Sequence, residues 1–153
     1  MEISRYIGPR ECLAPLFAEA DDSESEIASY INLGDVFVAR ENGIIVGHVQ
    51  VVETAESEIL EIKSLAVDES RRSNGIGATL VGAALADCRE RDAHTVLVAT
   101  AAASIGALQF YQRQGFRIRQ VIRDFYSASR GYRPLMINGI PLLDEVILDI
   151  ALR

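Results

Sequence analysis

The feature that most constrains this chain is an apolar strand that runs through a glycine-containing loop into a long helix. Residues 58–67 have the composition of a strand, residues 68–77 form the loop, and the helical pattern continues to about Arg91. The start of a helix carries unpaired backbone N–H groups and the positive end of the helix dipole. Gly75 and Gly77 keep Cβ atoms away from this point. The junction therefore predicts a cradle for the phosphates of an anionic cofactor.

Charge is distributed so that this junction differs from the rest of the chain. The 153 residues include 15 basic and 22 acidic side chains, which gives a net charge of −7. An acidic domain is a poor general binder of polyanions, so neither nucleic acid nor a membrane is expected as a partner. Arg71 and Arg72 stand directly before the glycine loop. They add positive charge at the one place where an anionic cofactor would bind.

Length and cysteine content narrow the class of protein further. The length fits one domain spanning residues 1–153. No apolar run approaches the roughly 20 residues of a membrane span, and no signal peptide opens the chain. Cys12 and Cys88 lie far apart and form no CxxC motif, so neither a metal site nor a disulfide is expected. These features predict a cytoplasmic protein.

Hydrophobic periodicity predicts a mixed α/β fold. The expected strands are residues 2–6, 36–40, 44–52, 58–67, 94–100, 116–125 and 145–152. Helices are expected from Pro9 with apolar positions Cys12, Leu13, Leu16 and Phe17, from Ser23 with a Ser23–Glu26 capping box, from the glycine loop to about Arg91, and over residues 104–114. Asn-Gly pairs at residues 42–43 and 138–139 predict tight turns, the second within a loop over residues 127–143. This order predicts a mixed, partly antiparallel sheet flanked by helices.

Two motifs in this order resemble a known family. The segment Arg72-Ser73-Asn74-Gly75-Ile76-Gly77 is similar to the (Gln/Arg)-x-x-Gly-x-(Gly/Ala) motif of the GNAT superfamily of acyl-CoA-dependent N-acetyltransferases. Downstream, Ala107-x-x-Phe110-Tyr111-x-x-x-Gly115-Phe116 resembles the second conserved helix of that family. An Asn138-Gly139-Ile140 turn before the last strand resembles an uncharacterised bacterial branch. The resemblance implies a GNAT-type fold with a splayed, mostly antiparallel sheet.

The resemblance also implies which residues bind acetyl-CoA. In the family, the strand before the loop separates from its parallel neighbour at a bulge, and the pantetheine arm lies in the gap. The partner strand here would be residues 95–99. The residues carried over as cofactor-binding are Leu65, Ala66 and Val67 on the strand, Arg72, Ser73, Asn74, Gly75, Ile76, Gly77 and Ala78 at the helix start, and Ser104 and Tyr111 downstream. Ser104 stands where many members have asparagine, and Arg71 is a weaker candidate for a phosphate contact.

The resemblance assigns two catalytic roles and leaves the base open. Tyr111 matches a tyrosine that protonates the leaving thiolate, and this role is favoured over the alternative of a core tyrosine that closes a helix face beside Phe110. Glu61 falls at the position of a glutamate that removes the proton of the acceptor ammonium, with a surface carboxylate paired with a basic residue as the alternative. Glu58 and His48 are the other candidates for this base.

The acceptor is expected to be a primary amine. Family members usually wall the acceptor pocket with the first two helices and the connection before the last strand. The acidic residues Glu19, Asp21, Asp22, Glu24 and Glu26 would attract a small cationic amine, although they also suit a solvated helix start. Phe125, Tyr126 and Tyr132 could line this pocket or a homodimer contact. The alternatives are a catalytically silent acyl-CoA-binding sensor and a protein acetyltransferase acting on lysine or N-terminal amines.

Overall fold

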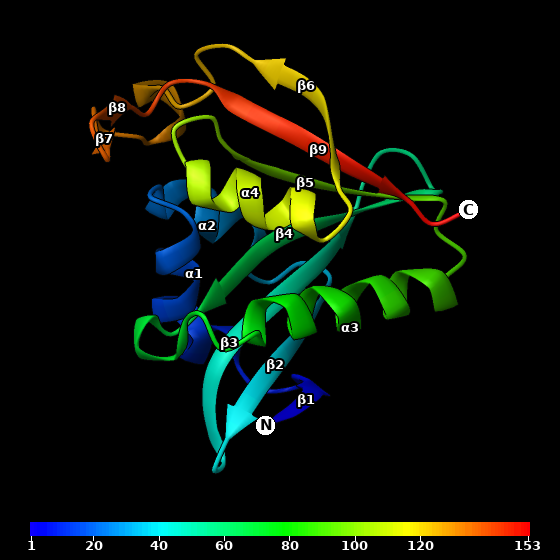
Figure 1. Ribbon diagram of the computed structural model, residues 1–153. Coiled ribbons are helices and arrows are strands. Elements are labelled where there is room, and N and C mark those ends of the chain that lie inside the picture. Colours follow the sequence, from blue (N-terminus) through cyan, green and yellow to red (C-terminus); the bar gives the residue numbers. More distant parts are fainter.

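A seven-stranded sheet in the order β1-β2-β3-β4-β5-β9-β6 forms the centre of the molecule (Figure 1). The computed structural model describes all residues, 1–153. All neighbouring strands are antiparallel except β4 and β5, which are parallel. The prediction of a mixed, mostly antiparallel sheet is confirmed. The strands are β1 (Glu2–Arg5), β2 (Asp35–Glu41), β3 (Ile44–Glu53), β4 (Ile59–Val67), β5 (Thr95–Ala101), β6 (Arg117–Ile122) and β9 (Glu145–Ala151).

Helices cover both faces of the sheet. The helices are α1 (Ala14–Ala20), α2 (Glu24–Tyr30), α3 (Ile76–Glu90) and α4 (Ile105–Arg113). Neighbouring residues of β3 show which helix covers which face. His48 stacks on Phe17 of α1 with ring centroids 4.3 Å apart, whereas Val49 belongs to the core cluster built on α3. Because successive side chains of a strand point to opposite faces, α1 and α2 lie on one face and α3 on the other.

The main core lies between α3 and the sheet. The apolar positions expected on one face of this helix, Ile76, Leu80, Val81, Ala84, Leu85 and Cys88, are all buried. They pack against valines of β3 and β5 and against Tyr111 and Phe116 beyond them. Burying each large apolar side chain contributes about 1.5–3 kcal/mol. None of the helices is long and apolar enough to cross a membrane.

Three sequence expectations about local structure need correction. The first helix does not run unbroken from Pro9, because a 3-10 turn, η1 (Arg10–Leu13), precedes α1 and leaves Cys12 exposed. The strand expected over residues 116–125 ends at Ile122, shortly before Asp124 adopts a positive φ of 57°. The segment 127–143 is more ordered than a simple loop. It contains the 3-10 turn η3 (Ala128–Arg130) and a small hairpin, β7 (Met136–Ile137) with β8 (Ile140–Pro141), around the predicted Asn-Gly turn.

The central feature of the sheet is a split between β4 and β5. Their parallel pairing ends at Ile62 and Val98. On the other side of β4, the register with β3 skips Lys63, because Val51 lies opposite Ile62 and Gln50 opposite Ser64. Lys63 is therefore a β-bulge residue, which bends its strand. The bulge stands where the two strands begin to separate, as the GNAT resemblance predicts.

The end of α2 is held in place by side chains from two other elements. Arg10 donates through Nη1 to the carbonyl oxygens of Ile31 and Leu33 at 2.8 and 2.9 Å, and through Nη2 to Gly34 at 2.7 Å. Gln50 of β3 donates through Nε2 to the carbonyl oxygen of Tyr30 at 2.7 Å. These bonds satisfy carbonyls that a helix end leaves unpaired. They fix the position of Tyr30, which lines the pocket described below.

Candidate active site

A groove opens between the amino end of α3, one side of α4 and the split in the sheet. Its volume is about 820 Å³. The floor is formed by Leu65, Ala66 and Val67 of β4. The residues lining its sides come from α1, the loop before α3, α3 and α4: Glu19, Arg71, Arg72, Ser73, Gly75, Ile76, Gly77, Ala78, Gly106, Ala107, Phe110, Tyr111, Arg113 and Gln114. All residues predicted to bind the cofactor line this groove except Asn74 and Ser104.

The start of α3 is open to an anion. Gly75 precedes the helix with φ +78°, and no side chain caps the end. The first intrahelical bond runs from the Thr79 N–H to the Gly75 carbonyl at 3.0 Å. The N–H groups of Ile76, Gly77 and Ala78 therefore have no partner within the helix. A phosphate can accept from these groups, so the residues present fit the pyrophosphate of an acyl-CoA.

Gly77 stands at a close contact between two helices. A Cβ atom at this position would lie 3.3 Å from Cζ of Phe110. The glycine therefore permits α3 and α4 to approach each other closely at the side of the groove. Gly75 differs, because its surroundings are open and its positive φ is what favours glycine.

The backbone of β4 presents free polar groups to the groove. Asp68 donates its backbone N–H to the carbonyl oxygen of Val46 in β3 at 2.7 Å. Alternate residues of an antiparallel strand bond to the same neighbour, so Ala66 also bonds to β3. Leu65 and Val67 direct their N–H and C=O groups to the opposite side, where β5 has already separated. These are the two residues whose backbone the resemblance assigned to pantetheine.

The arginines before the glycine loop have protein partners. Arg72 donates through Nη2 to Glu19 of α1 at 3.0 Å and through Nε to the Val67 carbonyl at 3.2 Å. Arg71 lies 3.9 Å from Glu41. Both side chains border the groove. Arg72 thus connects the loop before α3 to α1, and its positive charge remains beside the start of α3.

Tyr111 lies in α4 and closes the inner side of the groove. It is 8% exposed and packs edge-to-face on Phe110 and Phe116, with centroids 5.1 and 5.7 Å apart. Burial raises the pKa of its hydroxyl above the usual 10, so the group keeps its proton at neutral pH. A buried, protonated phenol bordering the groove can act as a proton donor.

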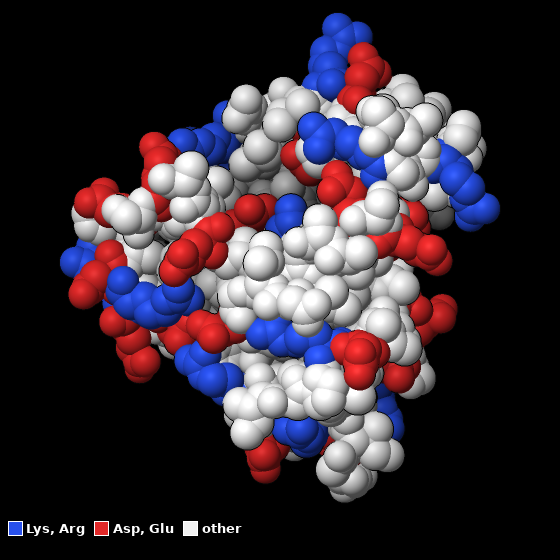
Figure 2. Space-filling view, turned by 180° about the vertical axis from the view of Figure 1, so that it is seen from behind, with Lys and Arg blue, Asp and Glu red and all other residues white.

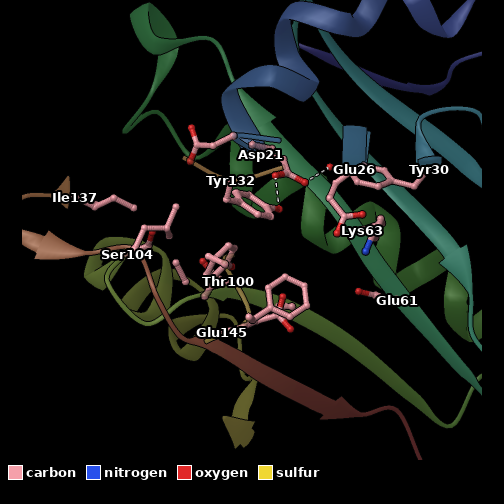
Figure 3. Close-up of a pocket in the computed structure, with 17 residues that line it drawn as sticks. Asp21, Glu26, Tyr30, Glu61, Lys63, Thr100, Ser104, Tyr132, Ile137 and Glu145 are labelled. Atoms are coloured by element: carbon pink, nitrogen blue, oxygen red, sulfur yellow. Dashed lines mark hydrogen bonds between the residues drawn. The ribbon is translucent and has the colours of Figure 1, made fainter. Parts of the chain in front are cut away.

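A second, smaller pocket lies on the other side of the split (Figure 3). Its volume is about 140 Å³. Asp21 lines it, and the Asp21 carboxylate accepts from the hydroxyls of Tyr30 at 2.8 Å and Tyr132 at 2.6 Å. The other lining residues are Ala20, Asp22, Glu26, Glu61, Lys63, Ala99, Thr100, Ala101, Ser104, Phe125, Tyr126, Ile137, Leu142 and Glu145. Residues of β4 line both cavities: Glu61 and Lys63 line the pocket, and residues 65–67 line the groove.

Acidic and aromatic side chains dominate this pocket. Its five carboxylates face a single basic lining residue, Lys63, whose Nζ lies 5.0 Å from the centre of the Tyr30 ring. Burial raises the pKa of Glu61, an effect that the nearby Lys63 opposes. Burial likewise raises the pKa of Glu145 to about 7. The acidic residues do not form a cluster that could hold a metal ion. The pocket therefore suits an organic cation.

The segment 127–143 closes the pocket from one side. Besides the bond from Tyr132 to Asp21, Ser23 donates to the Arg130 carbonyl at 2.7 Å. Arg130 also lies 3.5 Å from Glu26. These contacts join the segment to the connection between α1 and α2. On the face shown in Figure 2, acidic and basic side chains are interspersed and form no continuous basic area.

Comparison with known proteins identifies the family. The model of the acetyltransferase (GNAT) family matches residues 9–116. The chain belongs to the GNAT family. An uncharacterized N-acetyltransferase of Bacillus subtilis, YvbK, is 32% identical over 141 residues, which span 92% of this chain and 89% of the relative. Family membership confirms the predicted acyltransferase class and acetyl-CoA as the acetyl donor.

Solved GNAT structures share the fold over nearly the whole chain. A GNAT family acetyltransferase from Elizabethkingia anophelis with acetyl-CoA bound has a TM-score of 0.91 at 27% identity, covering 99% of this chain and 97% of the other. An IAA acetyltransferase from Bacillus cereus has a TM-score of 0.89 at 31% identity, with 99% of each chain covered. The predicted GNAT fold is confirmed.

Within this GNAT fold, the three candidate bases lie in different surroundings. Glu61 lines the pocket. Glu58 is exposed and lies 3.3 Å from His94 at the surface. His48 is fully buried, bonds to Ser64 at 2.8 Å, and burial lowers its pKa to about 3. Of the three, Glu61 alone lines the pocket.

Two further placements bear on the expected site. Ser104 precedes α4 and lines the small pocket rather than the groove, so its predicted role at the cofactor stays a prediction. Phe125, Tyr126 and Tyr132 all line the pocket. Glu145 was not among the candidates, because a carboxylate at the first position of a strand carries no motif. Its pairing partners in β5 and β6 place it in the pocket, and only the folded sheet reveals them.

Proposed function

We propose that this protein transfers the acetyl group of acetyl-CoA directly to a small cationic primary amine. One observation carries the proposal: the split between β4 and β5 joins an anion-binding helix start on one side to an acidic, aromatic pocket on the other. The first feature suits the pyrophosphate of the donor, and the second suits an ammonium group. The split lies between them, where a donor and an acceptor can meet.

The residues of the groove provide the donor site. The free N–H groups of Ile76, Gly77 and Ala78 would bind the pyrophosphate, and the loop residues Arg72, Ser73 and Asn74 precede them. Leu65 and Val67 offer backbone groups to the pantetheine arm, with Ala66 between them. When bound, acetyl-CoA supplies a thioester whose thiol leaves as the amine attacks. An N–H of β4 stabilises the negative charge that develops on the carbonyl oxygen.

Two side chains are assigned to the proton-transfer steps. The Tyr111 hydroxyl donates its proton to the departing sulfur, in line with the raised pKa that burial gives it. Glu61 assists the loss of the proton from the acceptor ammonium, which must become a neutral amine before it attacks. Its half-buried position on β4, two residues before the bulge and facing the pocket, supports this role.

The size and charge of the pocket support a small cation over a protein substrate. The segment 127–143 closes one side of the pocket, where it is held by the contacts of Tyr132 with Asp21 and of Arg130 with Ser23. An extended peptide would need an open groove instead. Aromatic rings and unbalanced carboxylates together favour a cationic group over a neutral one.

The proposal is tested by incubating the protein with acetyl-CoA and a panel of amines while thiol release is followed. Small diamines and other cationic primary amines are expected to give release together with an N-acetylated product in mass spectra. Peptides with lysine or a free amino terminus serve as the comparison. Tight binding of acetyl-CoA without release on any amine would instead show a sensor module, and release on peptides alone would show a protein acetyltransferase.

A valine at Gly77 is expected to weaken acetyl-CoA binding about tenfold. The added side chain would meet the Phe110 ring, which lies 3.3 Å from the position of Cβ, and would reshape the groove between α3 and α4. Overpacking of this kind costs about 1–3 kcal/mol, and 1.4 kcal/mol corresponds to tenfold in affinity. The matched control is Gly82→Val in the same helix, where a Cβ has no atom within 4 Å. Calorimetric titration with acetyl-CoA measures both variants, and equal affinities would contradict the prediction.

A further inference from the structure

We propose that Glu145 receives the proton of the acceptor ammonium and that Glu61 acts on this step through its charge. The inference rests on the proposed acetyl transfer and assigns a second carboxylate to its acceptor side. Glu145 is nearly buried, with 8% of its surface exposed, and it lines the pocket. Its carboxylate takes part in no hydrogen bond or ion pair within the chain. A buried carboxylate is costly without a partner, so one that faces a pocket points to a cationic ligand.

The register of the sheet places Glu145 beside the reacting region. The parallel pairing of β4 and β5 ends at Ile62 and Val98. Leu65 and Ala101 each lie three residues further along their strands, on the two sides of the split. Glu145 is the direct partner of Ala101. Because the bulge at Lys63 adds one residue to β4, Glu145 lies about level with Leu65 and Ala66, next to the backbone groups offered to the donor.

Glu61 lies further from this level. It is opposite Leu97, within the part of the sheet where β4 and β5 are still paired. Both glutamates line the same pocket, and Figure 3 shows Glu61 and Lys63 on one strand with Glu145 on another. An amine that attacks a thioester at the level of Leu65 is therefore nearer to the strand position of Glu145 than to that of Glu61. Glu61 contributes negative charge from the deeper, paired part of the sheet.

The groups around Glu145 bring the pKa of its carboxyl group close to neutral pH. Burial is the main cause of the raised pKa of about 7, and the negative charges of Glu61 and Asp21 raise it further. Lys63 and Arg130 oppose this effect. The phenol of Tyr126, whose own pKa is raised by burial and by Glu145, remains neutral. A base with a pKa near the working pH is effective in general base catalysis.

The step balances as a proton transfer followed by acyl transfer. The carboxylate of Glu145 takes one proton from the ammonium and becomes a carboxylic acid. The freed nitrogen lone pair forms the C–N bond with the acetyl carbon while the C–S bond breaks. The electron pair of that bond leaves with sulfur, which takes the proton of Tyr111. A second proton is lost from nitrogen to give the neutral amide, and solvent resets Glu145 and Tyr111.

The test is a pH–rate profile of kcat/KM and kcat for three isosteric variants with an amine that the wild-type protein acetylates. Glu145→Gln is expected to lower kcat about 100-fold and to remove the rise in kcat/KM centred near pH 7. Glu61→Gln is expected to keep that rise but shift it to lower pH, because a neighbouring negative charge is lost. Glu58→Gln is the matched control, since this carboxylate lies at the surface beside His94, and its profile should equal that of the wild type.

The outcomes separate this inference from the proposed function. If the wild-type protein acetylates no amine, the proposed function fails. If it is active and Glu145→Gln keeps both its rate and its rise near pH 7, the inference is wrong. A higher KM for the amine with unchanged kcat would also overturn it, because it would show a binding role alone. Thermal unfolding and acetyl-CoA titration of Glu145→Gln establish that the variant is folded and that its donor site is intact.

Discussion

Tyr111→Phe is expected to lower kcat about 100-fold while the affinity for acetyl-CoA stays that of the wild type. The substitution removes only the hydroxyl, and phenylalanine keeps the edge-to-face contacts with Phe110 and Phe116. The departing thiolate would then take its proton from water instead of from a positioned donor. Stopped-flow or steady-state thiol release gives kcat, and calorimetric titration gives the affinity for the donor.

The pH dependence of the wild-type protein provides a second check on this role. A proton donor is active below its own pKa, and burial raises the pKa of Tyr111 above 10. The rate should therefore not fall between pH 8 and pH 10 through loss of this proton. An unchanged kcat in Tyr111→Phe would mean that the residue only packs between α4 and the core.

Gly34→Ala is expected to destabilise the fold by about 4 kcal/mol or more, which is a large part of the 5–15 kcal/mol typical of a domain. Gly34 has a φ of +56°, and a Cβ at this position would overlap the carbonyl oxygen of Val51 and lie 2.9 Å from its carbonyl carbon. The clash is with backbone of β3, so no change of rotamer can relieve it. Urea unfolding at constant pH measures the loss.

Gly43→Ala is the matched control for this prediction. Gly43 also has a positive φ, +78°, but a Cβ there has no atom within 4 Å. The control variant should therefore show only the conformational cost of a non-glycine residue, about 1 kcal/mol. Similar losses in the two variants would show that φ, not the contact with Val51, makes glycine necessary at Gly34.

The donor side of the site could be predicted from sequence because its chemistry is local. A helix start, two glycines and the preceding strand are contiguous over residues 58–78, and residues 65–67 and 75–78 of this stretch line one groove. Tyr111 was found through a second motif. One contact could not be predicted, since only the folded chain shows that Gly77 also lies close to Phe110 of α4.

The acceptor side could be predicted only in outline. Glu61, Asp21 and Tyr132 were candidates, but Glu145 was not, because it reaches the pocket through pairing with Ala101 and Ile122, distant in sequence. The bulge at Lys63 also cannot be read from alternation, since it shifts the pattern of a strand by one residue. Both features depend on long-range strand register, for which the sequence contains no local signal.

The bulge residue has a practical consequence for spectroscopy. Lys63 is the single lysine of the chain, and its ammonium lies beside Tyr30 in the small pocket. Reductive methylation with carbon-13 would label this side chain and the amino terminus alone. Its methyl resonance, shifted by the aromatic ring, would then report directly on occupancy of the pocket by unlabelled compounds, without any engineered probe.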